Sequence, residues 1–187
     1  MSGQLEYMVT KNRFLALFFV NRQISAEARL IFYAKTAFCG DWDNLDQFFG
    51  SIPPFYKDHI RTVEFWCLDS SESPHCHALL LKMQRLQTAY ISYTCPQNAA
   101  GTNKDYFLHN KINFTVHIYH IFYPKFSSEE NLLCIEGWTL AKGTREWKRL
   151  TRQDVSTIPS LAEDKDSMAP TLIEGSTPDC FECEEHE

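Results

Sequence analysis

The sequence contains few glycines and none of the glycine-rich patterns that bind phosphate. Its seven glycines form neither a phosphate-binding loop nor a dinucleotide-binding fingerprint. The Gly-x-Ser-x-Gly elbow of hydrolases and the His-Glu-x-x-His zinc motif are also missing. We therefore expect a non-enzymatic protein without a cofactor. A small hydrolase or transferase with a dispersed active site stays open as the alternative.

Long hydrophobic runs and a disulfide pattern are missing as well. The apolar run 14–20 has seven residues, whereas a helix that spans a bilayer needs roughly 20. The seven cysteines are odd in number and scattered, which is typical of reduced thiols and not of a disulfide framework. The sequence therefore predicts no membrane association and a cytoplasmic or nuclear location.

Basic residues are fewer than acidic ones, and the acidic excess lies near the C-terminal end of the chain. The net charge is −6, but residues 156–187 hold nine acidic residues and one basic residue, which leaves +2 for the rest. This balance favours neither nucleic acid nor a membrane surface as a partner. The same segment is rich in Ser, Thr and Pro, so we expect a disordered acidic tail over 156–187 and one domain over 10–155.

Aromatic residues, in contrast, are plentiful. Phe, Tyr and Trp make up 14% of the chain, which is enough to fill a sizeable core. Apolar residues at helical spacing (Leu17, Val20, Ile24, Ala28 and Ile31) predict a first helix with one buried face. A short strand over 36–39 and a helix over 43–52 follow, with Asp41 or Asp43 as the N-cap and Pro53–Pro54 as the end.

The remaining pattern is rich in strands. Alternating or apolar stretches predict strands at 59–68, 88–95 and 111–123, with a helix from Ser73 between the first two. Residues 132–150 indicate a hairpin that turns near Lys142–Gly143. A strand, a helix and a second strand in this order predict a βαβ unit with parallel strands. The expected fold is one α/β domain with a mixed sheet and packed helices.

The first helix and the strand after it resemble a fungal family of F-box-like proteins of unknown function. The match covers about residues 15–70, and more loosely 70–95. It rests on Val20, Arg22, Gln23, Ile24, Glu27, Ala28, Phe32, Tyr33, Thr36 and Phe38. Asn21 stands where the family usually has Cys. We interpret these residues as structural, with Arg22 paired to Glu27 and with Phe32, Tyr33 and Phe38 packed together.

The resemblance implies an intracellular protein-interaction module, similar to the substrate-receptor part of F-box-like proteins. It also implies a leucine-rich-repeat-like element over the strand at 61–66, the helix at 74–86 and the strand at 88–93. The F-box half, which docks a Skp-type adaptor in that family, has no counterpart in residues 1–14. This departure argues against a Skp-type adaptor and leaves another, unidentified protein as the expected partner.

One basic segment offers an alternative function. Lys142, Arg145, Lys148, Arg149 and Arg152 surround Trp147, and such a strip can hold a nucleic-acid backbone and stack a base. The other interpretation is the solvated face of a hairpin, with Trp147 in the core. We keep weak nucleic-acid binding through 142–152 as a third hypothesis.

Possible metal ligands are weaker signals. His75–Cys76–His77 and the Cys180-x-x-Cys183 pair each form one ligand cluster, but a structural zinc site needs two. His117 and His120 lie three residues apart on a predicted strand, so they should face opposite sides of the sheet. We predict no metal site.

Overall fold

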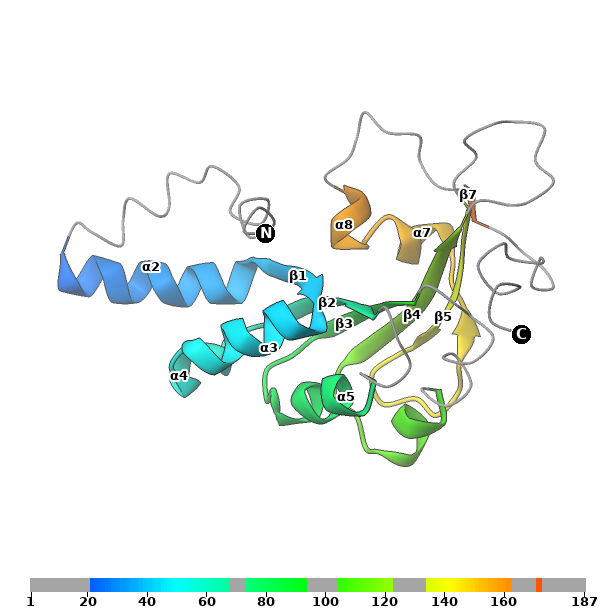
Figure 1. The fold of residues 1–187 in the computed structure, drawn as a ribbon, viewed down its shortest axis with the longest axis horizontal. Coiled ribbons are helices and arrows are strands. Elements are labelled where there is room, and N and C mark those ends of the chain that lie inside the picture. Colours follow the sequence, from blue (N-terminus) through cyan, green and yellow to red (C-terminus); the bar gives the residue numbers. More distant parts are fainter. Residues whose placement is uncertain (1–20, 68–72, 94–103, 123–133, 163–170, 173–187) are drawn as a thin grey trace.

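The computed structural model describes residues 21–67, 73–93, 104–122, 134–162 and 171–172. Figure 1 shows the chain as a ribbon. The elements follow one another in this order: α2 (Arg22–Lys35), β1 (Ala37–Asp41), α3 (Trp42–Ser51), α4 (Pro54–Lys57), β2 (Thr62–Cys67), α5 (Ser73–Lys82), β3 (Thr88–Tyr93), β4 (Thr115–Phe122), β5 (Cys134–Leu140), β6 (Lys148–Arg149), α7 (Arg152–Val155), α8 (Pro159–Ala162) and β7 (Thr171–Leu172). A further helical segment covers residues 104–109.

The strands form one mixed sheet in the order β1-β2-β3-β4-β5-β6, with β7 beside β5. Strands β1 to β4 are parallel, whereas β5 is antiparallel to both β4 and β6. The predicted α/β class and the predicted parallel βαβ unit, β2–α5–β3, are therefore confirmed. No helix among the described residues is both long enough and apolar enough to cross a membrane.

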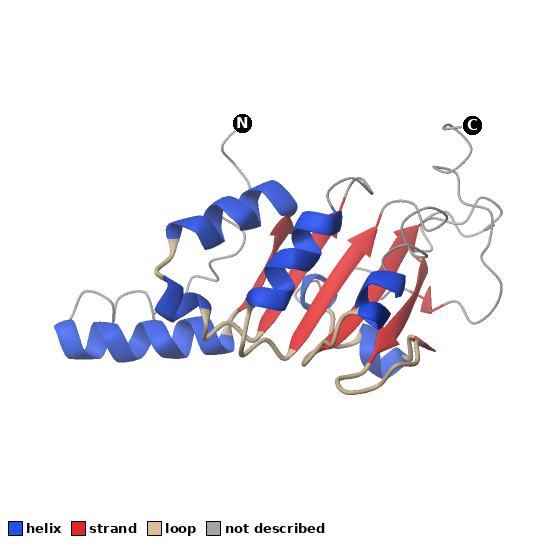
Figure 2. Ribbon diagram, turned by 90° about the horizontal axis from the view of Figure 1, so that it is seen from below, coloured by secondary structure: helices blue, strands red, loops and turns tan. Residues whose placement is uncertain are grey.

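The parallel strands follow one another at a nearly constant spacing. Ala37, Thr62, Thr88 and Thr115 lie side by side in the sheet, so successive partners are 25, 26 and 27 residues apart. Helices α3, α5 and 104–109 cover one side of the sheet, which we call the α5 face (Figures 1 and 2). Helices α7 and α8 cover part of the other side, the α8 face (Figure 1).

Polar caps and prolines set the helix ends. The cap at Asp41 and the proline after α3 were predicted, whereas the cap at Asn21 was not. The Asn21 side chain accepts a hydrogen bond of 2.8 Å from the Ile24 backbone N–H and caps α2. Asp41 caps α3 in the same way through the Asn44 N–H. Pro53 follows the end of α3, and Pro54 begins the short helix α4, which was not predicted.

The buried face of α2 differs from the prediction. Ala28 is its one buried residue, and Phe32 and Tyr33 pack partly against the core. Ile31, predicted to face inwards, is 51% exposed. The prediction gave the helix one buried face, whereas α2 extends outwards from the start of the edge strand β1 (Figure 1).

The hairpin at 132–150 is present as β5 and β6. Its loop turns at Ala141–Thr144, where the Thr144 N–H donates to the Ala141 carbonyl, and Gly143 has a φ of 77° that favours glycine. The strand predicted at 111–123 begins later, at Thr115. The residues just before it, Ile112 and Phe114, still bury their side chains in the core.

Two apolar clusters fill the two faces of the sheet. On the α5 face, residues such as Phe49, Ile60 and Phe65 are completely buried. The cluster on the α8 face includes Val155 of α7 and Ile158, which precedes α8.

The predicted domain boundary at residue 155 is therefore too early. The chain continues from α7 into a second short helix, and Ile158 is fully buried against the sheet. The predicted tail otherwise lies outside the described residues, apart from β7. Two four-residue helices with Ser, Thr and Pro between them have too little periodicity to be recognised in a sequence.

Candidate functional site

The aromatic residues of the F-box-like motif pack on one another. Ring centroids of Phe32 and Tyr33 are 5.3 Å apart, and both rings lie within 5.9 Å of Phe38. Tyr33 also stacks on Tyr56 of α4, and Phe38 stacks on Phe48 of α3. These contacts join α2 to β1, α3 and α4, which is the structural role that we assigned to the motif.

The polar residues of the motif lie on the surface. Glu27 accepts a hydrogen bond of 3.1 Å from the Gln23 side chain. In the described part of the chain, no ion pair joins Arg22 to Glu27, so that expectation is wrong. Arg22 and Glu27 are five residues apart, whereas helix neighbours are three or four apart. Val20 lies outside the described residues, and Ile24 and Thr36 are half-buried.

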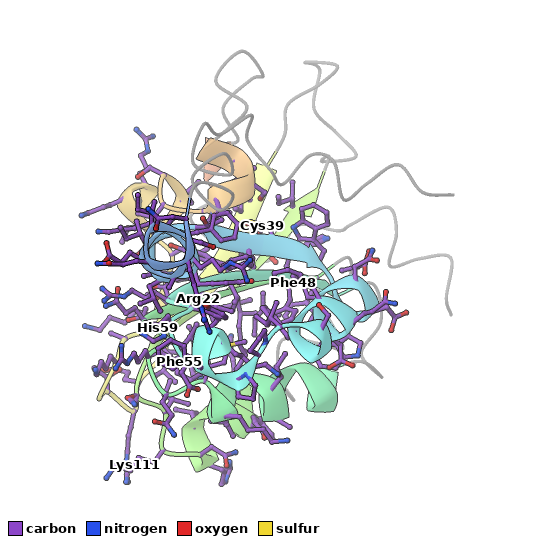
Figure 3. All side chains as sticks on the ribbon, turned by 90° about the vertical axis from the view of Figure 1, so that its left-hand side faces the viewer. Arg22, Cys39, Phe48, Phe55, His59 and Lys111 are labelled. Carbon is purple, nitrogen blue, oxygen red and sulfur yellow. The ribbon has the colours of Figure 1, made fainter. Side chains whose placement is uncertain are left out.

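Phe55 of α4 is the most exposed large apolar side chain in the described part of the chain, at 60%. Its ring centroid lies 5.0 Å from that of His59. Figure 3 looks along α2 and shows both side chains below this helix. They form a small apolar surface at the end of the molecule where the motif lies.

The basic strip does not form one surface. Lys148 lies opposite Thr139 and Arg149 lies opposite Trp138, so the two basic residues point to opposite sides of the sheet. Trp147 is half-buried against the core, and its indole N–H donates to the Lys104 carbonyl at 3.3 Å. Lys142, Arg145 and Arg152 are exposed in the loop and on α7. The hairpin interpretation agrees with this arrangement better than the nucleic-acid one does.

A buried carboxylate organises the α8 face. Glu64 of β2 is completely buried and accepts hydrogen bonds from four donors. The Tyr119 hydroxyl lies at 2.5 Å, the Ser160 backbone N–H at 2.9 Å and the Trp66 indole N–H at 3.2 Å, and the Ser160 hydroxyl is the fourth. Glu64 thus ties α8 to the middle of the sheet. Burial, and then the nearby Glu64 carboxylate, hold the pKa of Tyr119 well above its usual value.

An imidazole lies beside this network. His117 of β4 stacks on Tyr90 of β3 with a centroid distance of 4.8 Å, and the Tyr90 hydroxyl donates to Thr157 at 3.0 Å. Burial lowers the pKa of His117. His117 belongs to the α8 face and His120 to the α5 face, where it lies opposite Glu136, so the two histidines face opposite sides as predicted.

Charged side chains from three segments of the chain converge on the α5 face. The Lys104 ammonium, at the start of the 104–109 helix, lies 3.1 Å from the centroid of the Trp138 ring. The Arg149 guanidinium lies 5.1 Å from the same ring and 3.9 Å from a carboxylate oxygen of Glu136. We call Lys104, Glu136, Trp138 and Arg149 the Lys104 cluster.

The charges of the Lys104 cluster perturb one another. Glu136 is 1% exposed, and neither of its carboxylate oxygens has a hydrogen-bond partner among the described residues. Burial raises its pKa, which Arg149 and Lys104 lower in part. Burial and the nearby Arg149 lower the pKa of Lys104 to about 8, while Glu136 opposes that change. Glu136 lies opposite His120, near the carboxyl end of the parallel strand β4. Ligands of α/β sheets bind preferentially at such ends.

The candidate metal ligands named from the sequence lie mostly outside the described residues. His77 is buried and stacks on Tyr106 at 4.4 Å, and the side chains of His75 and Cys76 lie outside the description, as do Cys180 and Cys183. Within the described ranges, no group of three or more His, Cys, Asp or Glu residues could hold a metal ion.

Sequence reasoning missed the residues that matter most in both clusters. Glu64 and Glu136 each interrupt an otherwise apolar or aromatic strand, and a carboxylate in that position is an available signal of a buried polar site. Their partners could not be found in this way, because Ser160 and Lys104 are brought to them only by the folded chain.

Comparison with known proteins adds no relative. A scan against protein-family models found no match, and searches of curated proteins and of solved structures found none either.

Proposed function

We propose that this protein is a non-enzymatic protein-interaction module, similar to the substrate-receptor part of F-box-like proteins. The observation that carries the proposal is the order of the sheet. Four parallel strands follow one another at a spacing of 25 to 27 residues, and their connecting helices all lie on the α5 face. Repeat proteins with strands and helices arranged in this way use the strand face to bind partners.

The strand face offers an aromatic anchor for such a partner. Trp66 of β2 is 40% exposed and belongs to the α8 face, two residues after Glu64. Its indole N–H donates to the Glu64 carboxylate at 3.2 Å, which holds the ring in place. Half-buried, pre-organised tryptophans are frequent hot spots of protein interfaces because they bury much area at little entropic cost. We therefore place the binding surface around Trp66 and its neighbour Ser92.

The test is affinity capture of the tagged full chain from its native lysate, with two variants beside it. Trp66→Ala removes the proposed anchor, and Leu81→Ala removes a side chain of similar exposure on α5, on the opposite side. We expect defined proteins that the unmodified chain and Leu81→Ala retain but that folded Trp66→Ala loses. Equal recovery by all three chains would contradict the proposed surface, and recovery of a Skp-type adaptor would revive the adaptor hypothesis.

A second candidate function, a small enzyme with a dispersed site, is favoured by one observation. In the Lys104 cluster, an amine and a guanidinium from distant segments lie over one aromatic ring, and the guanidinium lies 3.9 Å from the Glu136 carboxylate. Neighbouring titratable groups whose pKa values are shifted by burial and by nearby charges are typical of catalytic sites.

A further inference from the structure

We propose that the Lys104 cluster is a covalent binding site for small carbonyl compounds that carry a carboxylate, with the Lys104 amine forming an imine. This inference gives the second candidate function a specific chemistry and does not depend on the protein-interaction function. It uses the α5 face, whereas the proposed partner surface lies around Trp66 on the α8 face.

The geometry gives each group a distinct role. Lys104 is half-buried, and it shares the Trp138 ring with the Arg149 guanidinium. A neighbouring cation and partial burial are the two conditions that activate lysine amines as nucleophiles. The Trp138 ring stabilises the ammonium form and limits this activation. Arg149 keeps 47% of its side chain exposed, so it can pair with a ligand carboxylate in two parallel hydrogen bonds.

Glu136 supplies the acid and base chemistry of the cluster. It is buried, its oxygens have no hydrogen-bond partner in the described part of the chain, and its ion pair with Arg149 is long at 3.9 Å. Burial favours the protonated form of the Glu136 carboxyl group, and the positive charges of Arg149 and Lys104 partly offset this effect. His120 of β4 lies opposite Glu136, on the same face of the sheet, and Tyr93 of β3 lies beside His120.

The covalent step balances with these groups alone. The free Lys104 amine attacks the carbonyl carbon, a C–N bond forms, and one of the two amine protons passes to the carbonyl oxygen to give a neutral carbinolamine. Glu136 donates a proton to the hydroxyl group, which leaves as water while the nitrogen lone pair forms the C=N bond. The proton lost from nitrogen returns to Glu136. The net reaction is amine plus carbonyl to imine plus water.

The experiment traps the imine on the folded full chain. The protein is incubated with glyoxylate and sodium cyanoborohydride at neutral pH, and the reduced adduct is located by peptide mass spectrometry. Lys111, which is exposed and lies two residues after the 104–109 helix, is the internal control (Figure 3). Because the pKa of Lys104 is lowered to about 8, a larger share of its amine is free at neutral pH, and we expect its modification to exceed that of Lys111 by at least about tenfold.

Two variants separate the cluster from simple exposure. Arg149→Gln should raise the glyoxylate concentration that gives half-maximal trapping at Lys104. Glu136→Gln should slow the rate of trapping at Lys104. Neither variant should change the modification of Lys111. Modification that follows exposure alone, with Lys111 equal to or above Lys104, would overturn the proposal. So would trapping at Lys104 that neither variant changes. Loss of partner capture by Trp66→Ala is a separate result, so the two functions can fail independently.

Discussion

At the scale of single residues, one buried polar group connects α8 to the middle of the sheet. Glu64 is completely buried in the sheet and accepts from Tyr119, Trp66 and Ser160. A carboxylate in this position is tolerated only because donors surround it. The same residue type at position 136 lacks such donors in the described part of the chain, which is why we assign chemistry to Glu136 and structure to Glu64.

Glu64→Ala should destabilise the protein strongly. The change leaves the Tyr119 hydroxyl and the Ser160 N–H buried without an acceptor, at a cost of about 1–3 kcal/mol for each donor. We expect the free energy of unfolding, measured by urea denaturation, to fall by about 2–5 kcal/mol. Asp46→Ala, an exposed acidic residue on α3, is the control and should change it by less than about 0.5 kcal/mol. Equal effects of the two substitutions would contradict the assigned role of Glu64.

His77 should make stability depend on pH. Burial lowers its pKa in the folded state from 6.5 to about 4, so only the unfolded chain binds a proton between these values. The stabilisation is complete above pH 6.5 and is lost as the pH falls towards 4, by about 3 kcal/mol in total. His77→Phe keeps the ring contacts with Tyr106 and Phe107 and should flatten this dependence. An unchanged pH profile of urea unfolding in this variant would contradict the buried neutral state.

At the scale of elements, strands β4 and β5 leave no room for a side chain at Gly137. A Cβ atom at Gly137 would lie 2.3 Å from the Ile118 carbonyl oxygen and 2.8 Å from the Tyr119 Cα atom. Both are backbone atoms, so the strands must separate to admit a methyl group. Gly50, in α3, has no atom within 4 Å of such a Cβ position.

Gly137→Ala and Gly50→Ala should therefore act in opposite directions. We expect Gly137→Ala to lower the free energy of unfolding by about 3 kcal/mol, because the added methyl group overpacks the interior of the sheet. Gly50→Ala should raise it by up to about 1 kcal/mol, since alanine stabilises a helix interior. Thermal denaturation followed by circular dichroism measures both. A neutral Gly137→Ala variant would show that the two strands are not packed as described.

The segment 156–162 is the element that sequence reasoning misplaced, and its packing is testable. Ile158 is fully buried on the α8 face, so Ile158→Ala should cost about 2–5 kcal/mol of stability. Ser156→Ala, an exposed neighbour, should cost little. Chemical denaturation of both variants distinguishes a packed segment from a tail, because in a tail both changes would be neutral.

At the scale of the whole molecule, local patterns were more predictable than long-range placement. The cap at Asp41 and the alternation in β4 depend on neighbouring residues, so they could be recognised in the sequence. The convergence of Lys104 with Glu136, and of Glu64 with Ser160, depends on how distant segments pack. No local sequence pattern indicates which distant residues come together in the folded chain, and for this reason neither cluster was predicted.

For the whole molecule we propose that α3, α5 and the 104–109 helix cover one face of the mixed sheet, and that the other face, beside α7 and α8, binds a protein. Amide hydrogen exchange of the full chain, with and without a partner that it retains in capture, tests this claim most directly. We predict added protection in β2 and β3 around Trp66 and Ser92, and none in α3 or α5. Protection confined to α3 and α5, with β2 and β3 unchanged, would contradict the claim.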